Sequence, residues 1–301
     1  MGISVHKIKK WFRMLTGKSI YHVNQGEGTL YSKTDVLGYY NDLTEKITRD
    51  APDILVPKYK MDTGDTVYFS IGVFQYGLAA YDLYLKTKDD IYLRKLLACS
   101  DWALEKQQED GSWISFDFVT PEAPYSSMAQ GEGISMLIRA HIVTQNQTYL
   151  NAAEKALDFM LKPISEGGVC EYQGEDICFY EYTNLPAVLN GWIFSVWGLY
   201  DYYKYTNEEK LKPVLDASVA SIKKALPSFD MKYWSKYDAG KCVASPFYHK
   251  LHIAQLRVMY DLFGGEEFLG YADRWEKYQK SFWNSKRAFV KKAMQKVFGK
   301  E

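Results

Sequence analysis

A repeat of roughly 60 residues constrains the fold of this chain more than any other feature. Four segments with the same plan begin at Gly77, Gly133, Gly191 and His252, so their starts lie 56, 58 and 61 residues apart. Each segment has an apolar stretch, a short polar turn, and a second stretch in which apolar residues recur at three- and four-residue steps. The first stretch is typical of a buried helix and the second of an amphipathic surface helix. The repeat therefore predicts four helical hairpins.

Alternating inner and outer helices of this period predict an all-α fold. We expect an incomplete α/α toroid of about four hairpins over residues 66–301. Residues 1–65 lack the repeat, and we expect them to form an irregular amino-terminal arm that packs on the toroid, with a helix over residues 35–49. Three long segments connect the hairpins and should gather at one end of the toroid: 111–130, 167–189 and 229–251. Loops held by a rigid scaffold often carry function, so we expect a cleft there.

Composition narrows the class of protein. The 301 residues carry 37 basic and 37 acidic side chains, which gives a formal net charge of zero, and 47% of them are hydrophobic. A nucleic-acid-binding chain would be basic overall, and a disordered one would be less apolar or more highly charged. No apolar run approaches the roughly 18–20 residues that span a bilayer. We therefore expect a globular protein with no nucleic-acid partner.

The cysteines and the amino terminus suggest a location. Cys99, Cys170, Cys178 and Cys242 lack the spacing of a metal site, and residues 1–19 lack the apolar core and cleavage site of a secretory signal. We therefore expect reduced thiols in a cytoplasmic protein. Residues 1–19 mix basic and aromatic side chains, so they are a candidate for peripheral contact with an anionic membrane. An ordinary capping helix or a frayed end is the alternative.

Aromatic residues make up 16% of the chain, including 25 tyrosines, and many of them fall in the three connections. Sugar-binding clefts use such side chains because a ring can stack on a sugar face while the hydroxyl group forms hydrogen bonds. Most of the tyrosines should simply pack in half-buried positions. The cluster in the connections nevertheless favours a carbohydrate ligand.

Six short motifs in order make the chain similar to a known family. The chain resembles the carboxy-terminal catalytic region of D-glucuronyl C5-epimerases, and more closely the short microbial members, which lack the large amino-terminal region of the animal enzymes. The motifs are Met128-Ala-Gln-Gly, Glu181-Tyr182, Val188-Leu-Asn-Gly, Gly198-Leu-Tyr-Asp, Tyr237-Asp238 and Tyr248-His-x-x-His. The resemblance implies an incomplete α/α barrel, in agreement with the repeat. It also implies conversion of D-glucuronate to L-iduronate within an acidic polysaccharide of the heparosan type, without a cofactor.

The resemblance also assigns candidate residues. Inversion at C5 requires a base on one face of the sugar ring and an acid on the other, and the family's active-site tyrosines match Tyr182 and Tyr248, with Tyr237 as a third. Its glutamate matches Glu181, which we expect to tune or relay protons with His249. We expect these catalytic residues to be joined by six substrate-binding residues: His249, Gln130, Asn190, Lys241, Tyr125 and Trp113.

A cation should neutralise the substrate carboxylate, because this lowers the barrier to proton removal. Here the chain departs from the animal enzymes, which have an arginine shortly before the Tyr-His motif and another after Tyr-Asp. Lys241, Lys236 or Lys250 could substitute, although lysine lacks the two-pronged fit of arginine to a carboxylate. Arg139 lies within a predicted inner helix, where we expect a buried ion pair.

Other functions remain open at this point. A polysaccharide lyase shares the first step and then expels the C4 oxygen, a glycoside hydrolase needs two carboxylates across the bond, and a binding module would use the aromatic rings only for stacking. His249 and His252 share a helix face, but zinc catalysis needs three protein ligands and we expect no metal. A homodimer is a further expectation, through an aromatic carboxy-terminal helix that contains Tyr271, Trp275, Tyr278, Phe282 and Trp283.

Overall fold

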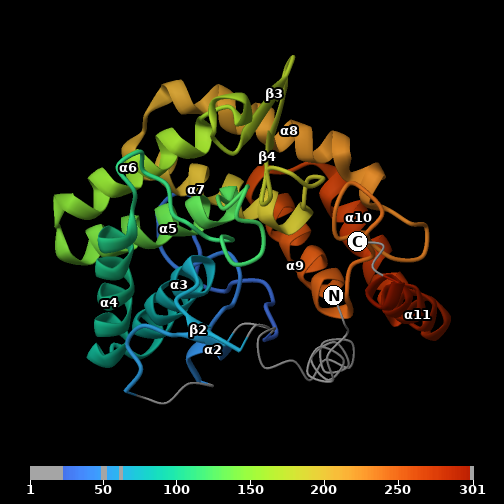
Figure 1. The fold of residues 1–301 in the computed structure, drawn as a ribbon, viewed down its shortest axis with the longest axis horizontal. Coiled ribbons are helices and arrows are strands. Elements are labelled where there is room, and N and C mark those ends of the chain that lie inside the picture. The colour runs from blue at the N-terminus through green and yellow to red at the C-terminus, as the bar shows by residue number, and fades with distance from the viewer. Residues whose placement is uncertain (1–22, 49–52, 61–63, 299–301) are drawn as a thin grey trace.

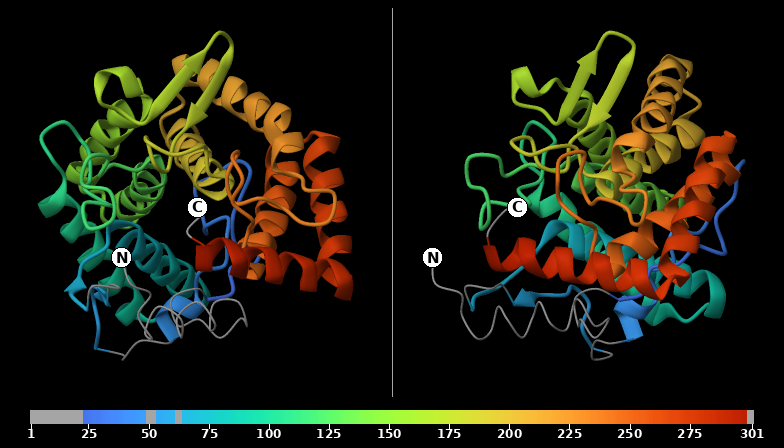
Figure 2. Two further views of the ribbon diagram at one scale, coloured as in Figure 1. Left: turned by 45° about the vertical axis from the view of Figure 1, so that its right-hand side comes forward. Right: turned by 90° about the vertical axis from the view of Figure 1, so that its right-hand side faces the viewer.

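The computed structural model describes residues 23–48, 53–60 and 64–298 and contains the four predicted helical hairpins (Figure 1). The inner helices are α3 (Ser70–Thr87), α5 (Ser127–Thr144), α7 (Leu189–Thr206) and α9 (Pro246–Phe263). The outer helices are α4 (Asp90–Lys106), α6 (Gln147–Leu161), α8 (Lys212–Phe229) and α10 (Glu266–Lys280). The hairpins follow one another around an arc (Figure 2), and each inner helix packs on the next, from α3 to α9. The fold is an α/α toroid, as predicted.

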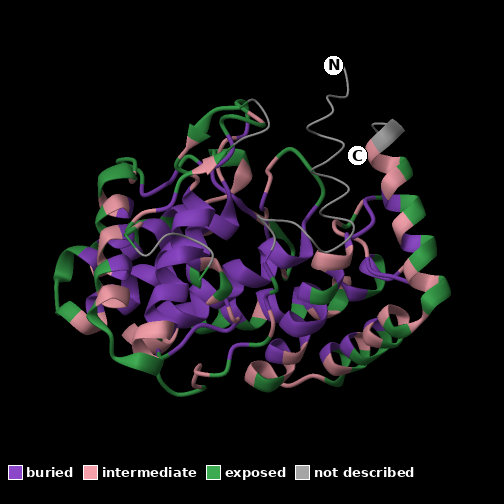
Figure 3. Cartoon of the chain, turned by 90° about the horizontal axis from the view of Figure 1, so that it is seen from below, coloured by how far each residue is buried: buried purple, intermediate pink, exposed green. Residues whose placement is uncertain are grey.

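The inner helices form the core. Almost every residue of α5 from Ser127 to His141 is buried, and buried residues gather in the middle of the molecule while the outer helices have exposed faces (Figure 3). Helices α5 and α7 lie close together at Gly198, where an added methyl group would lie 2.4 Å from the Cα of Gly131. Backbones this close leave no room for a side chain. This explains why a glycine occurs here in a helix whose other residues are mostly large and apolar.

The turns that close the four hairpins share one feature. The residue after each inner helix has a positive φ: Lys88 (59°), Gln145 (57°), Asn207 (55°) and Gly264 (66°). In the first two hairpins the next side chain, Asp89 or Asn146, then accepts a hydrogen bond from the first turn of the outer helix. This combination of a left-handed residue and a polar cap reverses the chain within two or three residues, and it accounts for the polar turn in the repeat.

Residues 31–40 lie across the carboxyl ends of the inner helices. The predicted helix over 35–49 is wrong for most of its length, because only α2 (Glu45–Thr48) is helical. Tyr39 and Tyr40 are instead completely buried among the inner helices, and this tertiary packing overrides the local helical pattern. The Nε of Arg139 donates to the carbonyl of Leu37 (2.8 Å), and the hydroxyl group of Tyr40 donates to Asp201 (2.6 Å).

Arg139 forms the buried ion pair that the sequence predicted. Its Nη1 lies 2.6 Å from Oδ2 of Asp201, and both side chains are almost fully excluded from solvent. The ion pair therefore joins α5 to α7 beneath residues 23–48. The division of the chain at residue 65 stays a prediction.

The long connections between hairpins run at the opposite end, beside the amino ends of the inner helices. The segment between α6 and α7 holds a feature that we did not predict, an antiparallel hairpin of β3 (Cys170–Gln173) and β4 (Asp176–Phe179), preceded by the 3-10 helix η1 (Ile164–Glu166). A second small pair, β1 (Tyr59–Lys60) and β2 (Thr66–Val67), lies before α3, and the 3-10 helix η2 (Glu209–Leu211) precedes α8. All four cysteines are free.

The carboxy-terminal aromatic residues do not share one helix, which corrects our expectation. The chain breaks at Ser281 between α10 and α11 (Phe282–Phe298), and Trp275 is completely buried on the toroid. Phe282 and Trp283, by contrast, are exposed. Within the described ranges, no helix is both long and apolar enough to cross a bilayer. Residues 1–19, the candidate membrane contact, lie outside the described part of the chain.

Candidate active site

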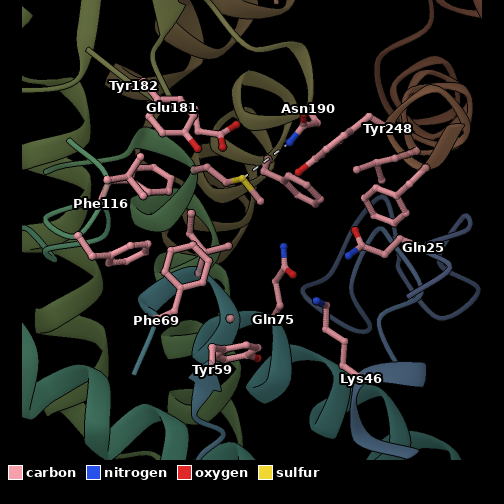
Figure 4. Close-up of a pocket in the computed structure, with 18 of the residues that line it drawn as sticks. Gln25, Lys46, Tyr59, Phe69, Gln75, Phe116, Glu181, Tyr182, Asn190 and Tyr248 are labelled. Atoms are coloured by element: carbon pink, nitrogen blue, oxygen red, sulfur yellow. Dashed lines mark hydrogen bonds between the residues drawn. The ribbon is translucent and has the colours of Figure 1, made fainter. Parts of the chain in front are cut away.

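A cavity of about 330 Å³ opens at the amino ends of the inner helices (Figure 4). Four of the predicted site residues line it, namely Glu181, Tyr182, Asn190 and Tyr248. Most of the other lining residues are aromatic or apolar, and the polar or charged ones among them are Gln25, Lys46, Tyr59, Lys60 and Gln75. A mostly apolar concave site with a few convergent polar groups is typical of a small-molecule or sugar-residue pocket.

Glu181 lies at the centre of the polar wall. Glu181 lies two residues after the end of β4. The carbonyl of the intervening Tyr180 accepts a hydrogen bond from the N–H of Ser127, the first residue of α5 (3.0 Å), and this bond fixes the loop to that helix. Oε1 of Glu181 accepts a hydrogen bond from the hydroxyl group of Tyr237 (3.4 Å), and its buried Oε2 has no partner. Burial raises the pKa of Glu181 to about 8, and the nearby hydroxyl groups of Tyr237 and Tyr182 oppose this rise. The carboxyl group is therefore mostly protonated at neutral pH.

Tyr182 and Tyr248 flank Glu181 and come from different parts of the fold (Figure 4). The ring of Tyr182 stacks on Phe116 with 4.2 Å between centroids. Tyr248 lies in the first turn of α9, where Ser245 caps its backbone N–H (3.4 Å). Burial raises the pKa of both phenols, and the nearby Glu181 raises both further. Both groups are therefore neutral phenols at neutral pH.

Tyr237 lies behind these two residues and links them. Besides its hydrogen bond to Glu181, its ring lies 4.7 Å from that of Tyr248, and burial raises its pKa well above the ordinary value. Its backbone carbonyl accepts a hydrogen bond from the N–H of Leu189 at the start of α7 (3.3 Å). The four predicted catalytic residues thus form one contiguous cluster, although they come from three separate segments of the chain.

The opposite wall of the cavity holds polar residues that the sequence analysis missed (Figure 4). Gln75 of α3 donates from Nε2 to Oε1 of Glu132 (2.7 Å), which leaves its own carbonyl oxygen for a ligand. Burial raises the pKa of Glu132 well above the ordinary value. Lys46 of α2 and Lys60 of β1 supply positive charge. No local motif identifies these lysines, because residues 23–48 and 53–60 reach the cavity through their packing against the inner helices.

Five of the predicted substrate-binding residues do not line the cavity, so the structure does not place them for direct contact with a ligand there. Gln130 is buried and donates to the carbonyl of Gly111 (3.1 Å), and Trp113 donates to that of Ala103 (2.9 Å). Tyr125 packs against Phe159, 5.1 Å between centroids. Lys241 is exposed, and its carbonyl accepts a hydrogen bond from Gln295. Their helices and loops continue into the site, but these side chains point elsewhere.

His249, the fifth, supports the site from behind. It is completely buried and stacks on Trp234 with 3.7 Å between centroids. Its Nδ1 accepts a hydrogen bond from the backbone N–H of Ser235 (3.1 Å) and its Nε2 lies 2.9 Å from the carbonyl of Trp275. Burial lowers the pKa of His249 to about 3, so it stays neutral. It ties the loop that carries Tyr237 to the helix that carries Tyr248.

The comparison with protein families decides the membership of this chain. The model of the D-glucuronyl C5-epimerase C-terminus matches residues 113–277. The chain belongs to this family. All four members of the Glu181–tyrosine cluster fall within the matched residues, whereas Lys46, Lys60 and Gln75 precede them. No group of three or more His, Cys, Asp or Glu side chains that could hold a metal ion occurs in the described segments.

Relatives differ in how much of their length they share. The chain is 30% identical over 207 residues to the D-glucuronyl C5-epimerase of Caenorhabditis elegans. The matched region covers 59% of this chain and 34% of that protein. It therefore spans about a third of that relative. An uncharacterized protein of Methanocaldococcus jannaschii is 24% identical over 82% of this chain and 89% of its own length. Among solved structures, an unsaturated glucuronyl hydrolase specific for heparin covers 83% of both chains with a TM-score of 0.50 and 13% identity, which shows a shared fold.

Proposed function

We propose that this member of the epimerase family inverts C5 of D-glucuronate residues to give L-iduronate within an acidic polysaccharide of the heparosan type. One observation carries the proposal: within the family-matched residues, Tyr182 and Tyr248 flank the buried Glu181 in a single cavity. Two hydroxyl groups from different elements are what proton removal from one face and proton return to the other require.

The C5 proton lies next to a carboxylate and is a very weak acid, so a strong base must remove it. A phenolate is suited to this step because the ordinary pKa of tyrosine is about 10. In our proposal one of Tyr182 and Tyr248 removes the proton and the other returns one to the opposite face. Between these two steps, the electron pair of the broken C–H bond is delocalised onto the substrate carboxylate. C4 keeps its oxygen throughout.

Glu181 would prepare the base. Both phenols are neutral at neutral pH, so one must lose its proton before it can act as a base. The pKa of Glu181, about 8, is close to neutral pH, so a fraction of its carboxyl groups is ionised. The ionised form can accept the phenolic proton directly or through Tyr237. The phenolate becomes neutral again when it takes the C5 proton. The protonated carboxyl group would then replace the proton that the other tyrosine gives to the opposite face of C5.

Lys46 and Lys60 replace the lysines considered from the sequence as candidates to neutralise the substrate carboxylate. Lys241 and Lys250 are exposed and, like Lys236, do not line the cavity. Lys46 extends from α2 on the side opposite Glu181, where α2 is fixed by the buried side chains of Leu43 and Ile47 (Figure 4). A lysine in a small cavity offers a positive point charge to the carboxylate of a substrate.

Product analysis on heparosan tests the proposed reaction. We expect purified protein to generate iduronate signals in proton NMR spectra, with no new reducing ends and no ultraviolet-absorbing unsaturated uronate. An unsaturated product would identify a lyase, and new reducing ends would identify a hydrolase. Either product in place of iduronate would overturn the proposal.

Variants of Lys46 test the proposed cation. Lys46→Ala should lower kcat by roughly a hundredfold, in line with the loss of one charge-stabilising donor, and Lys46→Arg should restore part of the rate. Lys58→Ala is the matched control, because Lys58 is exposed in the same segment and does not line the cavity. Full activity of Lys46→Ala would reject Lys46 as the cation and leave the epimerase proposal intact.

A further inference from the structure

Helix α11 presents its apolar side chains to solvent. The exposed fractions are 79% for Trp283, 64% for Phe282, and 54% for both Val290 and Met294. Trp283, Val290 and Met294 recur at seven- and four-residue steps, so they share a face of the helix. They line one shallow groove together with Lys286, Arg287 and Lys291. This reverses the usual arrangement, in which a surface helix turns its apolar side inward.

The inward face of α11 is fixed to the toroid by polar contacts. Gln295 accepts a hydrogen bond from the N–H of Val243 (2.9 Å) and donates to the carbonyl of Lys241 (2.7 Å). Lys292 is buried, with its Nζ 3.1 Å from Sγ of Cys242. These contacts set the rotation of the helix about its axis. The exposure of the apolar face therefore follows from specific bonds on the other side and is not a consequence of a loosely attached helix.

Charge is also concentrated on this helix. Residues 282–298 include Lys286, Arg287, Lys291, Lys292 and Lys296 and no acidic residue, in a chain whose formal net charge is zero. Figure 3 shows α11 at the edge of the molecule, beside the carboxy-terminal label, with exposed residues along its length. A strip of apolar side chains bordered by lysines and an arginine is thus displayed outward.

We propose that this face of α11 docks on the surface of an anionic lipid membrane. Helices that lie in a membrane interface combine a face of tryptophan and aliphatic residues with flanking basic residues. Trp283 can sit at the level of the headgroups, while Val290 and Met294 enter the acyl boundary. The long side chains of Lys286, Arg287 and Lys291 can reach back to anionic headgroups. The active-site loop that carries Tyr237 is attached to the same helix through Val243, so docking holds the site close to the membrane.

Two other occupants fit the surface less well. A symmetric second copy would bring the same basic face against itself, because a twofold interface repeats one patch on both subunits. An acidic polysaccharide would satisfy the positive charge and could stack on Trp283, but it gives no role to the exposed aliphatic side chains of Val290 and Met294.

Flotation of the full chain with vesicles tests the docking surface. We expect binding to phosphatidylcholine vesicles that contain phosphatidylglycerol, little binding to phosphatidylcholine alone, and weaker binding at high salt. Val290→Asp and Lys291→Glu should each weaken vesicle binding roughly tenfold or more. Lys277→Glu, an exposed lysine on α10, is the matched charge control and should change binding little.

Three outcomes would overturn the proposal. Undiminished vesicle binding of both α11 variants would place the membrane contact elsewhere, for example in residues 1–19. A dimer in solution that dissociates on Val290→Asp would make this face an interface between copies. Loss of affinity for soluble heparosan, with vesicle binding unchanged, would assign the face to the polysaccharide. Circular dichroism of each variant checks that α11 is still folded.

Discussion

The carboxyl group of Glu181 lies directly against the backbone of Gly191 in the first turn of α7. A methyl group added at Gly191 would come within 2.5 Å of Oε2 of Glu181. The glycine of the Val188-Leu-Asn-Gly motif therefore makes room for the glutamate of the Glu181-Tyr182 motif. This contact gives one physical reason for two motifs that are separate in the sequence.

Gly191→Ala should displace Glu181 without unfolding the protein. Because a misplacement of about 1 Å in a catalytic group can reduce turnover about a hundredfold, we expect a loss of that order in kcat. Gly270→Ala is the control, since an added methyl group there meets nothing within 4 Å. Rates and thermal unfolding of the two variants would be compared. Unchanged turnover of Gly191→Ala would show that the position of Glu181 does not matter for the reaction.

The rate should depend on the ionisation of Glu181. Its pKa is raised to about 8 by burial, so the form that accepts a proton is scarce at pH 6 and predominates above pH 8. We expect kcat/KM to increase with pH through about 8, and Glu181→Gln to remove this increase together with most of the activity. A rate that falls through this pH range would instead assign Glu181 the role of an acid.

The same pKa shift predicts that the stability of the fold decreases over the pH range in which the rate increases. Between the ordinary glutamate pKa of 4.5 and about 8, the folded chain holds a proton that the unfolded chain has lost. Stability must therefore fall as pH rises across this window. Glu181→Gln should be more stable than the unsubstituted protein at pH 8, by of the order of 1–3 kcal/mol, with a smaller difference at pH 5. Urea unfolding at both pH values measures this, and equal stability at pH 8 would contradict the raised pKa.

The repeat was sufficient to predict the scaffold from the sequence. The apolar stretches that begin at Gly77, Gly133, Gly191 and His252 all lie in inner helices, although those helices start two to seven residues earlier. Because the connections were drawn too long, we assigned Gln130 and Tyr248 to loops, whereas they occupy the first turns of α5 and α9. Helix starts are hard to locate when the first turn is rich in polar and aromatic residues.

The polar wall of the cavity was predictable only in part. Glu181, Tyr182, Tyr237 and Tyr248 were found together because the family motifs name them. Gln75 was not, because it precedes Gly77, where the predicted inner helix began. Lys46 was not, because its position depends on how residues 23–48 pack across the inner helices. The expected helix over 35–49 failed for the same reason, since burial of Tyr39 and Tyr40 outweighs the local pattern. Such tertiary effects have no signature within a short stretch of sequence.

The packing of residues 23–48 on the inner helices should depend on the hydrogen bond between Tyr40 and the buried Asp201. Hydrogen bonds to charged groups contribute about 1.5–3 kcal/mol, so Tyr40→Phe should lower the free energy of unfolding by roughly that amount. Tyr260→Phe is the control, because its hydrogen bond to Glu266 is exposed, and it should cost less than about 0.5 kcal/mol. Urea unfolding measures both. Equal effects would show that the Tyr40 contact does not anchor this segment.

The most direct test of the central claim is deuterium incorporation at C5 of heparosan incubated with the protein in D2O, followed by proton NMR. We predict that deuterium enters C5 as iduronate signals develop, and that Tyr182→Phe and Tyr248→Phe each abolish epimerisation. A variant that keeps only the base can still exchange the C5 proton without inversion, which would identify the side on which each tyrosine acts. Absence of C5 exchange on heparosan, chondroitin and other glucuronate polymers would contradict the account.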